Sequence, residues 1–396
     1  MPPGIIQLQA KGDKDMYISE NPQISVFKYN YYRSMNFAAE TIVLPLNDNV
    51  NFGKATSCKI EKYGHLLSKL YLCVKLPMLT QNGGSYACWT DNIGRALFSK
   101  PIELEIGGVV VDYCYPQFLD MYSDLTESAP VSGRNLMTLK SDTYVSNQRN
   151  ATQETDLIIP IEFWFTKNYT LALPLLAMYQ QQVKLNMYFR DFSELVNYDG
   201  DEPDRVEVSG SQMLAEYIFL DDQIISDYQQ NTHTYLIEQI HFQGNESIPA
   251  NQPLFNTALK FTKPTKEIVF ACVETGNIEN NNYFVYSRSS DNRAPIKSAT
   301  LLLDGSRRFD NLPEFYFRSV VPYAIHKTVP SKYIYCIPFS IRPEDNQPTG
   351  HFNPERFTDV TLNLNMTPDN PPMSIFIYGV CYTIVQIQNG VLTVAF

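Results

Sequence analysis

Positive charge is scarce in this sequence. Its 396 residues include 31 Lys and Arg against 42 Asp and Glu, which gives a formal net charge of −11. The basic residues are scattered singly along the chain. A protein that binds duplex nucleic acid needs a basic surface to neutralise the phosphates. The composition therefore argues against direct nucleic-acid binding.

Long apolar runs and paired cysteines are also missing. No run reaches the roughly 18 apolar residues of a membrane span, and residues 1–15 lack the basic start and apolar centre of a signal peptide. The seven cysteines are widely spaced and include no C-x-x-C pair. This spacing predicts buried, reduced thiols and neither a disulfide framework nor a zinc site. We therefore expect a soluble protein that is synthesised in the cytoplasm.

Motifs for catalysis are lacking. The five histidines are far apart, and the chain contains no H-E-x-x-H, P-loop, G-x-S-x-G or G-x-G-x-x-G pattern. We therefore predict no catalytic residue, no cofactor and no metal ligand. The carboxylate pairs Asp221–Asp222 and Glu344–Asp345 are typical of solvated loops, although a glycosidase would also use a carboxylate pair.

Four N-x-S/T sequons are present. Asn150, Asn168 and Asn245 are candidate glycosylation sites. Asn365 is a poor acceptor because it lies in a predicted strand.

The sequence is rich in residues that favour β-structure. It contains 26 Tyr and 23 Phe, in short runs separated by Pro, Gly, Asn and Asp. In VTLNLNM (360–366) every second residue is apolar, which predicts a strand with one buried and one polar face. Similar strand patterns occur at residues 69–79, 101–112, 181–189, 233–242, 266–274, 298–305 and 357–366.

Helical patterns are few, and the chain divides into two similar halves. Helical turns are expected at 116–128 and in 170–182, where a short helix would open near Pro174. In both halves an apolar strand is followed by a glycine turn and a P-x-F step, at Pro116 and at Pro313. Such a duplicated all-β unit suggests two eight-stranded jelly rolls.

The acidic segment around Gly200, Pro203 and Gly210 is the best candidate for a linker. We therefore divide the chain into an N-terminal arm (1–23), a first jelly roll (24–192), a linker (193–214) and a second jelly roll (215–396).

The stretch VFKYNYY (26–32) raises the choice between an aromatic platform for nucleic-acid bases and a sheet strand. Only Lys28 is cationic within it, so base stacking lacks an electrostatic partner. We predict a strand with Phe27, Tyr29 and Tyr31 on one face. Two long polar loops, 129–150 and 276–295, are candidates for binding neighbours, and surface loops without a partner remain the alternative.

Several motifs occur in a fixed order: NPQI at 21–24, IGGxxxD at 106–112, LALPL at 171–175 and PEDNQPTG at 343–350. With the segments around them, they resemble the major capsid proteins of nucleocytoplasmic large DNA viruses from about residue 20 to residue 385. The chain departs from the usual pattern of the family at residues 353–359 and in its C-terminal QNGVLTVAF.

This resemblance implies an all-β double jelly roll with a few short helices in its connections. It further implies a structural protein that assembles as a pseudo-hexagonal homotrimeric capsomer and tiles an icosahedral shell. The implied partners are neighbouring capsomers and minor capsid proteins under the shell, with an internal viral membrane involved only indirectly. The implied location is the virion, after synthesis in the host cytoplasm.

Two other functions stay open at this point. The chain could be a minor capsid or scaffold paralogue of the same fold. It could also be a glycan-binding protein or glycan hydrolase built on paired jelly rolls, which would need a carboxylate pair in an aromatic cleft.

Overall fold

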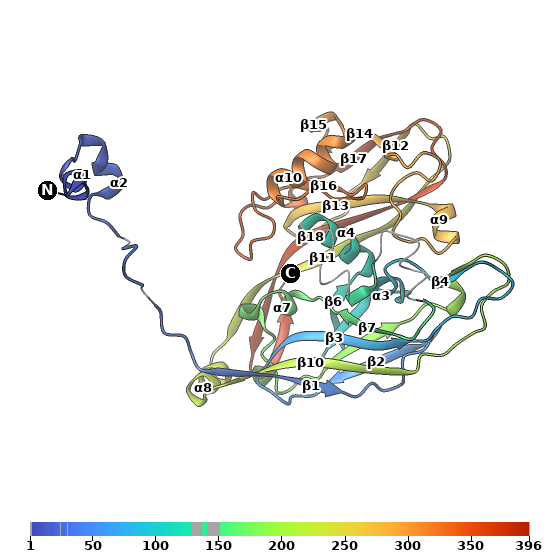
Figure 1. Cartoon of the computed structure of the whole chain (residues 1–396), viewed down its shortest axis with the longest axis horizontal. Coiled ribbons are helices and arrows are strands. Elements are labelled where there is room, and N and C mark those ends of the chain that lie inside the picture. Colours follow the sequence, from blue (N-terminus) through green and yellow to red (C-terminus); the bar gives the residue numbers. More distant parts are fainter. Residues whose placement is uncertain (1, 24, 30, 128–136, 141–150, 396) are drawn as a thin grey trace. The chain divides into compact units, whose positions relative to one another are not determined.

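The computed structural model describes residues 2–23, 25–29, 31–127, 137–140 and 151–395. The chain forms two units, residues 1–37 and residues 38–396 (Figure 1). The described residues of the first unit form three short helical elements, and none of the residues in these elements is buried. They are α1 (Pro3–Gln9), η1 (Asp13–Asp15) and α2 (Met16–Ser19).

Two four-stranded antiparallel sheets form a first sandwich, in the strand orders β1-β10-β3-β7 and β2-β8-β5-β6. The same half of the chain also forms a separate two-stranded antiparallel sheet from β4 and β9. The strands are β1 (Phe37–Leu44), β2 (Ala55–Ile60), β3 (Leu66–Leu76), β4 (Ala87–Trp89), β5 (Ile102–Ile106), β6 (Val109–Cys114), β7 (Thr155–Pro160), β8 (Val183–Tyr188), β9 (Val196–Tyr198) and β10 (Gly210–Leu220).

The second sandwich is built in the same way, from the orders β11-β18-β13-β16 and β12-β17-β14-β15, with β19 added beside β18. Its strands are β11 (His233–Ile248), β12 (Leu254–Ala258), β13 (Thr265–Glu274), β14 (Ile296–Leu303), β15 (Ser306–Pro313), β16 (Tyr335–Pro338), β17 (Val360–Met366), β18 (Met373–Gln388) and β19 (Val391–Val394). Position by position, β3 corresponds to β13, β5 to β14 and β6 to β15. The predicted double jelly roll is confirmed.

Short helices fill the connections, as predicted. The longest, α4 (Pro116–Thr126), matches the predicted helix at 116–128, and the segment after Pro174 forms a single 3-10 turn, η3 (Leu175–Ala177). The other named helical elements among the described residues after 37 are α3 (Ile93–Ala96), α7 (Trp164–Lys167), η2 (Tyr169–Leu171), η4 (Phe192–Glu194), α8 (Asp222–Gln230), α9 (Thr275–Glu279), η5 (Tyr316–Val320), α10 (Val321–Ile325) and η6 (Pro354–Arg356). Within the described ranges, no helix is long and apolar enough to cross a membrane.

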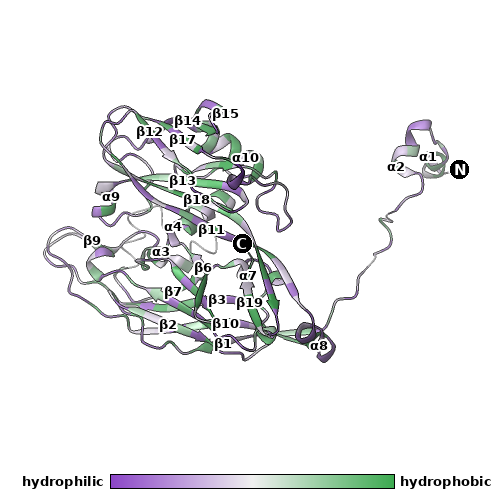
Figure 2. Cartoon of the chain, turned by 180° about the vertical axis from the view of Figure 1, so that it is seen from behind, coloured by the Kyte–Doolittle hydropathy of each residue, from purple (hydrophilic) through white to green (hydrophobic). Residues whose placement is uncertain are grey.

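Alternation in the sequence explains most strands. In β17, Val360, Leu362, Leu364 and Met366 are buried and the residues between them are half-buried. The β5–β6 hairpin turns at Gly107 and Gly108, whose φ angles of 63° and 85° suit glycine in a tight turn. Figure 2 colours the chain by hydropathy and shows α8, which has no buried residue, largely in purple.

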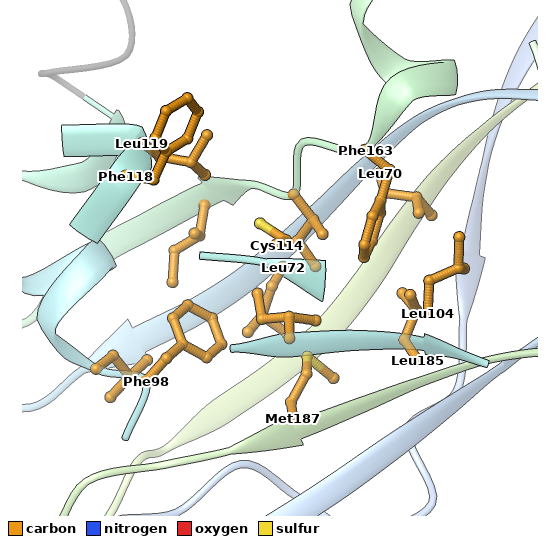
Figure 3. Packing of buried hydrophobic residues seen from close by; sticks show 14 of the residues in the cluster. Leu70, Leu72, Phe98, Leu104, Cys114, Phe118, Leu119, Phe163, Leu185 and Met187 are labelled. Carbon is orange, nitrogen blue, oxygen red and sulfur yellow. The ribbon is translucent and has the colours of Figure 1, made fainter. Parts of the chain in front are cut away.

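Each sandwich encloses an apolar core. In the first, Leu70 and Leu72 of β3 meet Leu104 of β5 and Leu185 of β8 in one cluster (Figure 3). A second cluster, which includes Leu362 and Leu364, fills the other sandwich. All seven cysteines are free, and all are buried except the half-buried Cys73. This agrees with the predicted reduced thiols.

The strand β13 is buried along its whole length. Ile268, Phe270 and Cys272 face the core of the second sandwich. Val269, Ala271 and Val273 belong instead to the cluster that includes the core of the first sandwich. The continuous apolar run IVFACV in the sequence reflects this burial on both faces.

The predicted linker at 193–214 contains ordered elements of the first sandwich. It holds β9, which pairs with β4, and the start of β10, which pairs with β3. The proposed domain boundaries themselves stay a prediction.

Candidate assembly interface

The two sandwiches meet along α4, which we call the seam helix. Pro116 occupies its first turn, where the missing N–H is no loss. Phe118, Met121 and Leu125 recur at three- and four-residue spacing and are at most 1% exposed. In Figure 1 the helix lies between the sheets of the two sandwiches. A helix covered on this face needs a partner surface, and the second sandwich provides part of it.

Aromatic rings make part of this contact. Phe118 lies 5.5 Å from Tyr378 of β18, measured between ring centroids. Tyr378 also stacks on Phe242 of β11 at 4.7 Å and meets Tyr115 at 5.6 Å. Aromatic pairs with this geometry stabilise the contact by more than the burial of their surface alone would.

A buried carboxylate, Asp120, holds the seam together. One oxygen, Oδ1, accepts a hydrogen bond from Asn92 at 2.8 Å and lies 3.2 Å from the ammonium of Lys140. The other, Oδ2, accepts from the hydroxyl of Tyr286 at 3.0 Å and from Lys332 at 3.2 Å. Asn92 and Lys140 come from the first half of the chain, and Tyr286 and Lys332 from the second. We call these five residues the Asp120 cluster.

The electrostatics of the cluster favour the charged carboxylate. Burial alone would raise the pKa of Asp120, but the ammonium groups of Lys332 and Lys140 outweigh it and hold this pKa well below its usual range. Burial beside the carboxylate raises the pKa of the Tyr286 hydroxyl well above its usual value. At neutral pH the hydroxyl therefore stays a donor to Asp120.

The loop at 276–295 packs within the chain. The amide of Asn281 donates to the carbonyls of Ser193 and Val196 at 2.8 and 2.9 Å. The hydroxyl of Tyr283 donates to the carbonyl of Glu194 at 2.9 Å, and Phe284 is only 5% exposed. Several side chains of this candidate binding loop thus contact the first half of the same chain. The other candidate loop, 129–150, lies outside the described residues except for 137–140.

The second sandwich has a helical segment at the place equivalent to the seam helix. It consists of η5, a π-helical turn, and α10, which follows it directly. Pro322 in the first turn of α10 has no N–H to donate to the preceding turn, which accounts for the irregular winding. The P-x-F step starts both segments, with Phe315 in the position of Phe118.

The outer side of this segment is exposed. Phe315 is 56% exposed, whereas its counterpart Phe118 is 1% exposed. Tyr316, Val320 and Tyr323 are 38%, 46% and 70% exposed. We call Phe315, Tyr316, Val320 and Tyr323 the α10 face. The same helical position is therefore covered in the first sandwich and uncovered in the second.

A second polar cluster is buried next to α10. Glu267 of β13 and Cys336 of β16 lie on neighbouring strands, since Val269 is the direct partner of Cys336 and Glu267 is two residues away on the same face. His326 follows the last turn of α10. Its Nε2 is 3.1 Å from Oε2 of Glu267, and its Nδ1 is 2.8 Å from Oε1 of Glu344.

The predicted site residues lie apart from these clusters. Asn150 is outside the described residues. Asn168 is half-buried, and its side chain accepts from the Thr170 amide at 3.0 Å. Asn245 is exposed in β11. Asn365 lies in β17 as predicted, where its amide donates to Ser298 and to Asn311. Glycosylation at Asn150, Asn168 and Asn245 stays a prediction.

The predicted strand at 26–32 is wrong for this chain. Its described residues form no strand, and Phe27, Tyr29, Tyr31 and Tyr32 are 98%, 88%, 74% and 96% exposed. The alternation of aromatic and polar residues is present, but regular pairing begins only with β1 at Phe37.

The two carboxylate pairs noted in the sequence lie in different surroundings. Asp221 and Asp222 begin the exposed helix α8. Glu344 is bound to His326, and Asp345 pairs with Arg342 at 3.2 Å. Each pair is thus engaged in local structure.

The chain matches two family models of viral proteins. One is described as the N-terminus of a major capsid protein and matches residues 25–221. The other is described as a large eukaryotic DNA virus major capsid protein and matches residues 226–393. Together they span most of both sandwiches.

Individual relatives agree with these models. The chain is 31% identical to a major capsid protein of Pyramimonas orientalis virus, over 98% of this chain and 97% of that protein. It is 29% identical to that of Paramecium bursaria Chlorella virus 1, over 91% of this chain and 86% of that protein. A solved PBCV-1 capsid structure superposes with a TM-score of 0.80 at 25% identity, covering 94% of this chain and all of the other.

Proposed function

This chain belongs to the major capsid protein family of large eukaryotic DNA viruses, and we propose that it acts as a homotrimeric, pseudo-hexagonal capsomer. Its role is structural, as a component of the viral capsid. The confirmed fold gives each chain two jelly rolls, so three chains would supply six. We propose no enzymatic activity.

The exposed α10 face is the observation that supports this proposal most strongly. Within one chain, the seam helix of the first sandwich packs on the second sandwich. The equivalent helical segment of the second sandwich exposes Phe315 where the first buries Phe118. A second copy that placed its first sandwich against the α10 face would repeat the seam between chains. Such a head-to-tail contact forms a ring when its rotation closes.

The residues of the α10 face suit an obligate contact. Aromatic side chains are enriched at the centres of protein interfaces. Burying the exposed parts of Phe315 and Tyr323 would each contribute about 1–3 kcal/mol. Because both side chains project from one short helical segment, a single partner surface can cover them together.

Further contacts are expected from the exposed aromatics of the first unit. Phe27, Tyr29, Tyr31 and Tyr32 leave a large apolar area in water. We propose that neighbouring capsomers or minor capsid proteins under the shell cover this stretch. Direct nucleic-acid binding is not part of the proposal, given the net charge of −11. Any relation to an internal viral membrane would be indirect, and synthesis would take place in the host cytoplasm.

Light scattering after size exclusion, in reducing buffer at neutral pH, tests the trimer. We expect a mass near three times the 45.3 kDa of the chain. The double variant F315S/Y323S should shift the mass towards one chain while its circular dichroism stays unchanged. V109S is the control, because Val109 is equally apolar and 66% exposed but lies on the β5–β6 hairpin.

Two results would contradict the proposal. A wild-type chain that is monomeric at every concentration would oppose the trimer and favour a minor capsid or scaffold paralogue. A trimer that F315S/Y323S leaves intact would show that the α10 face is not the contact.

A further inference from the structure

Three potential metal ligands converge on the face of β13 and β16 that is turned away from the core of the second sandwich and towards the first. Oε2 of Glu267, Nε2 of His326 and Sγ of Cys336 all lie within 4.8 Å of one another. The side chains of Glu267 and His326 have no exposed surface, and Cys336 is also fully buried. A carboxylate, an imidazole and a thiolate are the three side-chain types that bind zinc in proteins.

The distances between these atoms fit one ion. Nε2 of His326 is 3.1 Å from Oε2 of Glu267 and 4.0 Å from Sγ of Cys336, and the sulfur is 3.6 Å from the carboxylate oxygen. Tetrahedral zinc with ordinary bond lengths sets nitrogen and oxygen about 3.3 Å apart, and either of them about 3.5 Å from sulfur. Each observed separation is within roughly half an ångström of these values.

The carboxylate also has an unused oxygen. Oε1 of Glu267 is buried and has no hydrogen-bond partner among the described residues. An unpartnered carboxylate oxygen in the interior is costly, so such an atom calls for an explanation. A cation bound to Glu267 would satisfy it, through either a second bond or a water in the fourth position.

The surroundings of His326 are those of a metal ligand. Its Nδ1 is bound to Glu344 at 2.8 Å, which leaves Nε2 directed at the other two groups. Carboxylates that hold the second nitrogen of a ligating histidine fix its tautomer and orientation. With neutral His326, the charges of Glu267 and a Cys336 thiolate would balance a divalent ion.

We propose that Glu267, His326 and Cys336 bind a structural zinc ion that joins β13, β16 and the end of α10. The three ligand residues are buried, and a second bond from Glu267 or a bound water would complete the fourfold coordination that zinc prefers. This site is an alternative to our prediction that the sequence holds no metal ligand, and the experiment below decides between the two. The inference concerns contacts within one chain and does not depend on the proposed trimer.

Metal analysis of the wild-type protein tests this directly. After expression in zinc-supplemented medium and desalting, we expect one zinc ion per chain by mass spectrometry. Replacement by cobalt should give a thiolate-to-cobalt charge-transfer band in the near ultraviolet. Cys336→Ala should remove both the zinc and the band. Cys272→Ala is the matched control, because Cys272 is equally buried but faces the apolar core.

The proposal is overturned if the wild-type chain carries zinc only at background level and gives no thiolate band with cobalt. It is also overturned if Cys336→Ala keeps the full zinc content. Should Cys336→Ala fail to fold, the cobalt spectrum of the wild-type chain decides alone.

Discussion

The Asp120 cluster offers the sharpest test of what joins the two sandwiches. Replacing Asp120 by Asn keeps the shape of the side chain but removes its charge. Lys140, whose side chain is 5% exposed, and Lys332, at 17%, would then share a buried site in which Asp124, 3.9 Å from Lys140, is the remaining carboxylate. Removing one partner of a buried ion pair costs about 3–5 kcal/mol.

This loss converts into a shift of the unfolding temperature. The unfolding entropy is about 2.1 cal/mol/K per residue, or roughly 0.75 kcal/mol/K for residues 38–396. A loss of about 3–5 kcal/mol therefore lowers the midpoint by about 4–7 °C. Differential scanning calorimetry at neutral pH, with equal protein concentrations, measures this shift.

An exposed ion pair provides the control. Asp310 pairs with Arg307 at 2.5 Å, and both side chains are more than half exposed. Exposed pairs contribute little, so Asp310→Asn should move the midpoint by less than about 1 °C. Should Asp120→Asn unfold at the same temperature as Asp310→Asn, the buried cluster does not stabilise the seam and our reasoning is refuted.

The pH dependence gives a second readout. The folded-state pKa of Asp120 lies below its unfolded value of 3.8, so its contribution is complete above that pKa and is lost as the pH falls. The difference between wild type and Asp120→Asn should be constant from pH 8 to about 5 and shrink below about pH 4. A difference that instead shrinks between pH 8 and 6 would exclude this carboxylate as the cause.

Two further predictions concern single positions. Burial raises the pKa of Asp112 to about 7, above its unfolded value of 3.8, so its contribution to stability falls as the pH rises through that window. Asp112→Asn should therefore raise the unfolding temperature relative to wild type at pH 8 and not at pH 4, and equal shifts at both would contradict this. A Cβ on Gly84 would meet the backbone oxygen of Asp199 at 1.5 Å, whereas one on Gly210 meets nothing within 4 Å. Gly84→Ala should cost about 1–3 kcal/mol in urea unfolding and Gly210→Ala less than about 1, and similar losses would contradict the steric argument.

The sequence predicted the strands that have one buried face. The alternation in VTLNLNM led to β17, and the Gly107–Gly108 pair led to the β5–β6 hairpin, because both depend only on neighbours in the chain. The helix at 116–126 was predictable for the same reason. The repeated order of apolar strand, glycine turn and P-x-F step suggested two jelly rolls, and the family resemblance then supported this fold.

Sequence patterns did not predict contacts between residues that are far apart in the chain, or whether a predicted strand finds another strand to pair with. Glu267 and His326 are 59 residues apart and His326 and Cys336 are 10 apart, and no spacing rule joins them. The strand predicted at 26–32 needs a neighbouring edge to pair with, and alternation alone does not supply one. The linker at 193–214 stays a prediction, but the acidic and glycine content on which it rested did not reveal that β10 pairs with β3.

The burial of β13 on both faces has a thermodynamic consequence. One face completes the core of the second sandwich, and the other packs into the cluster that includes the core of the first. Neither core can open without exposing one face of this strand. The two duplicated halves should therefore unfold in one cooperative transition, because β13 contributes side chains to both clusters.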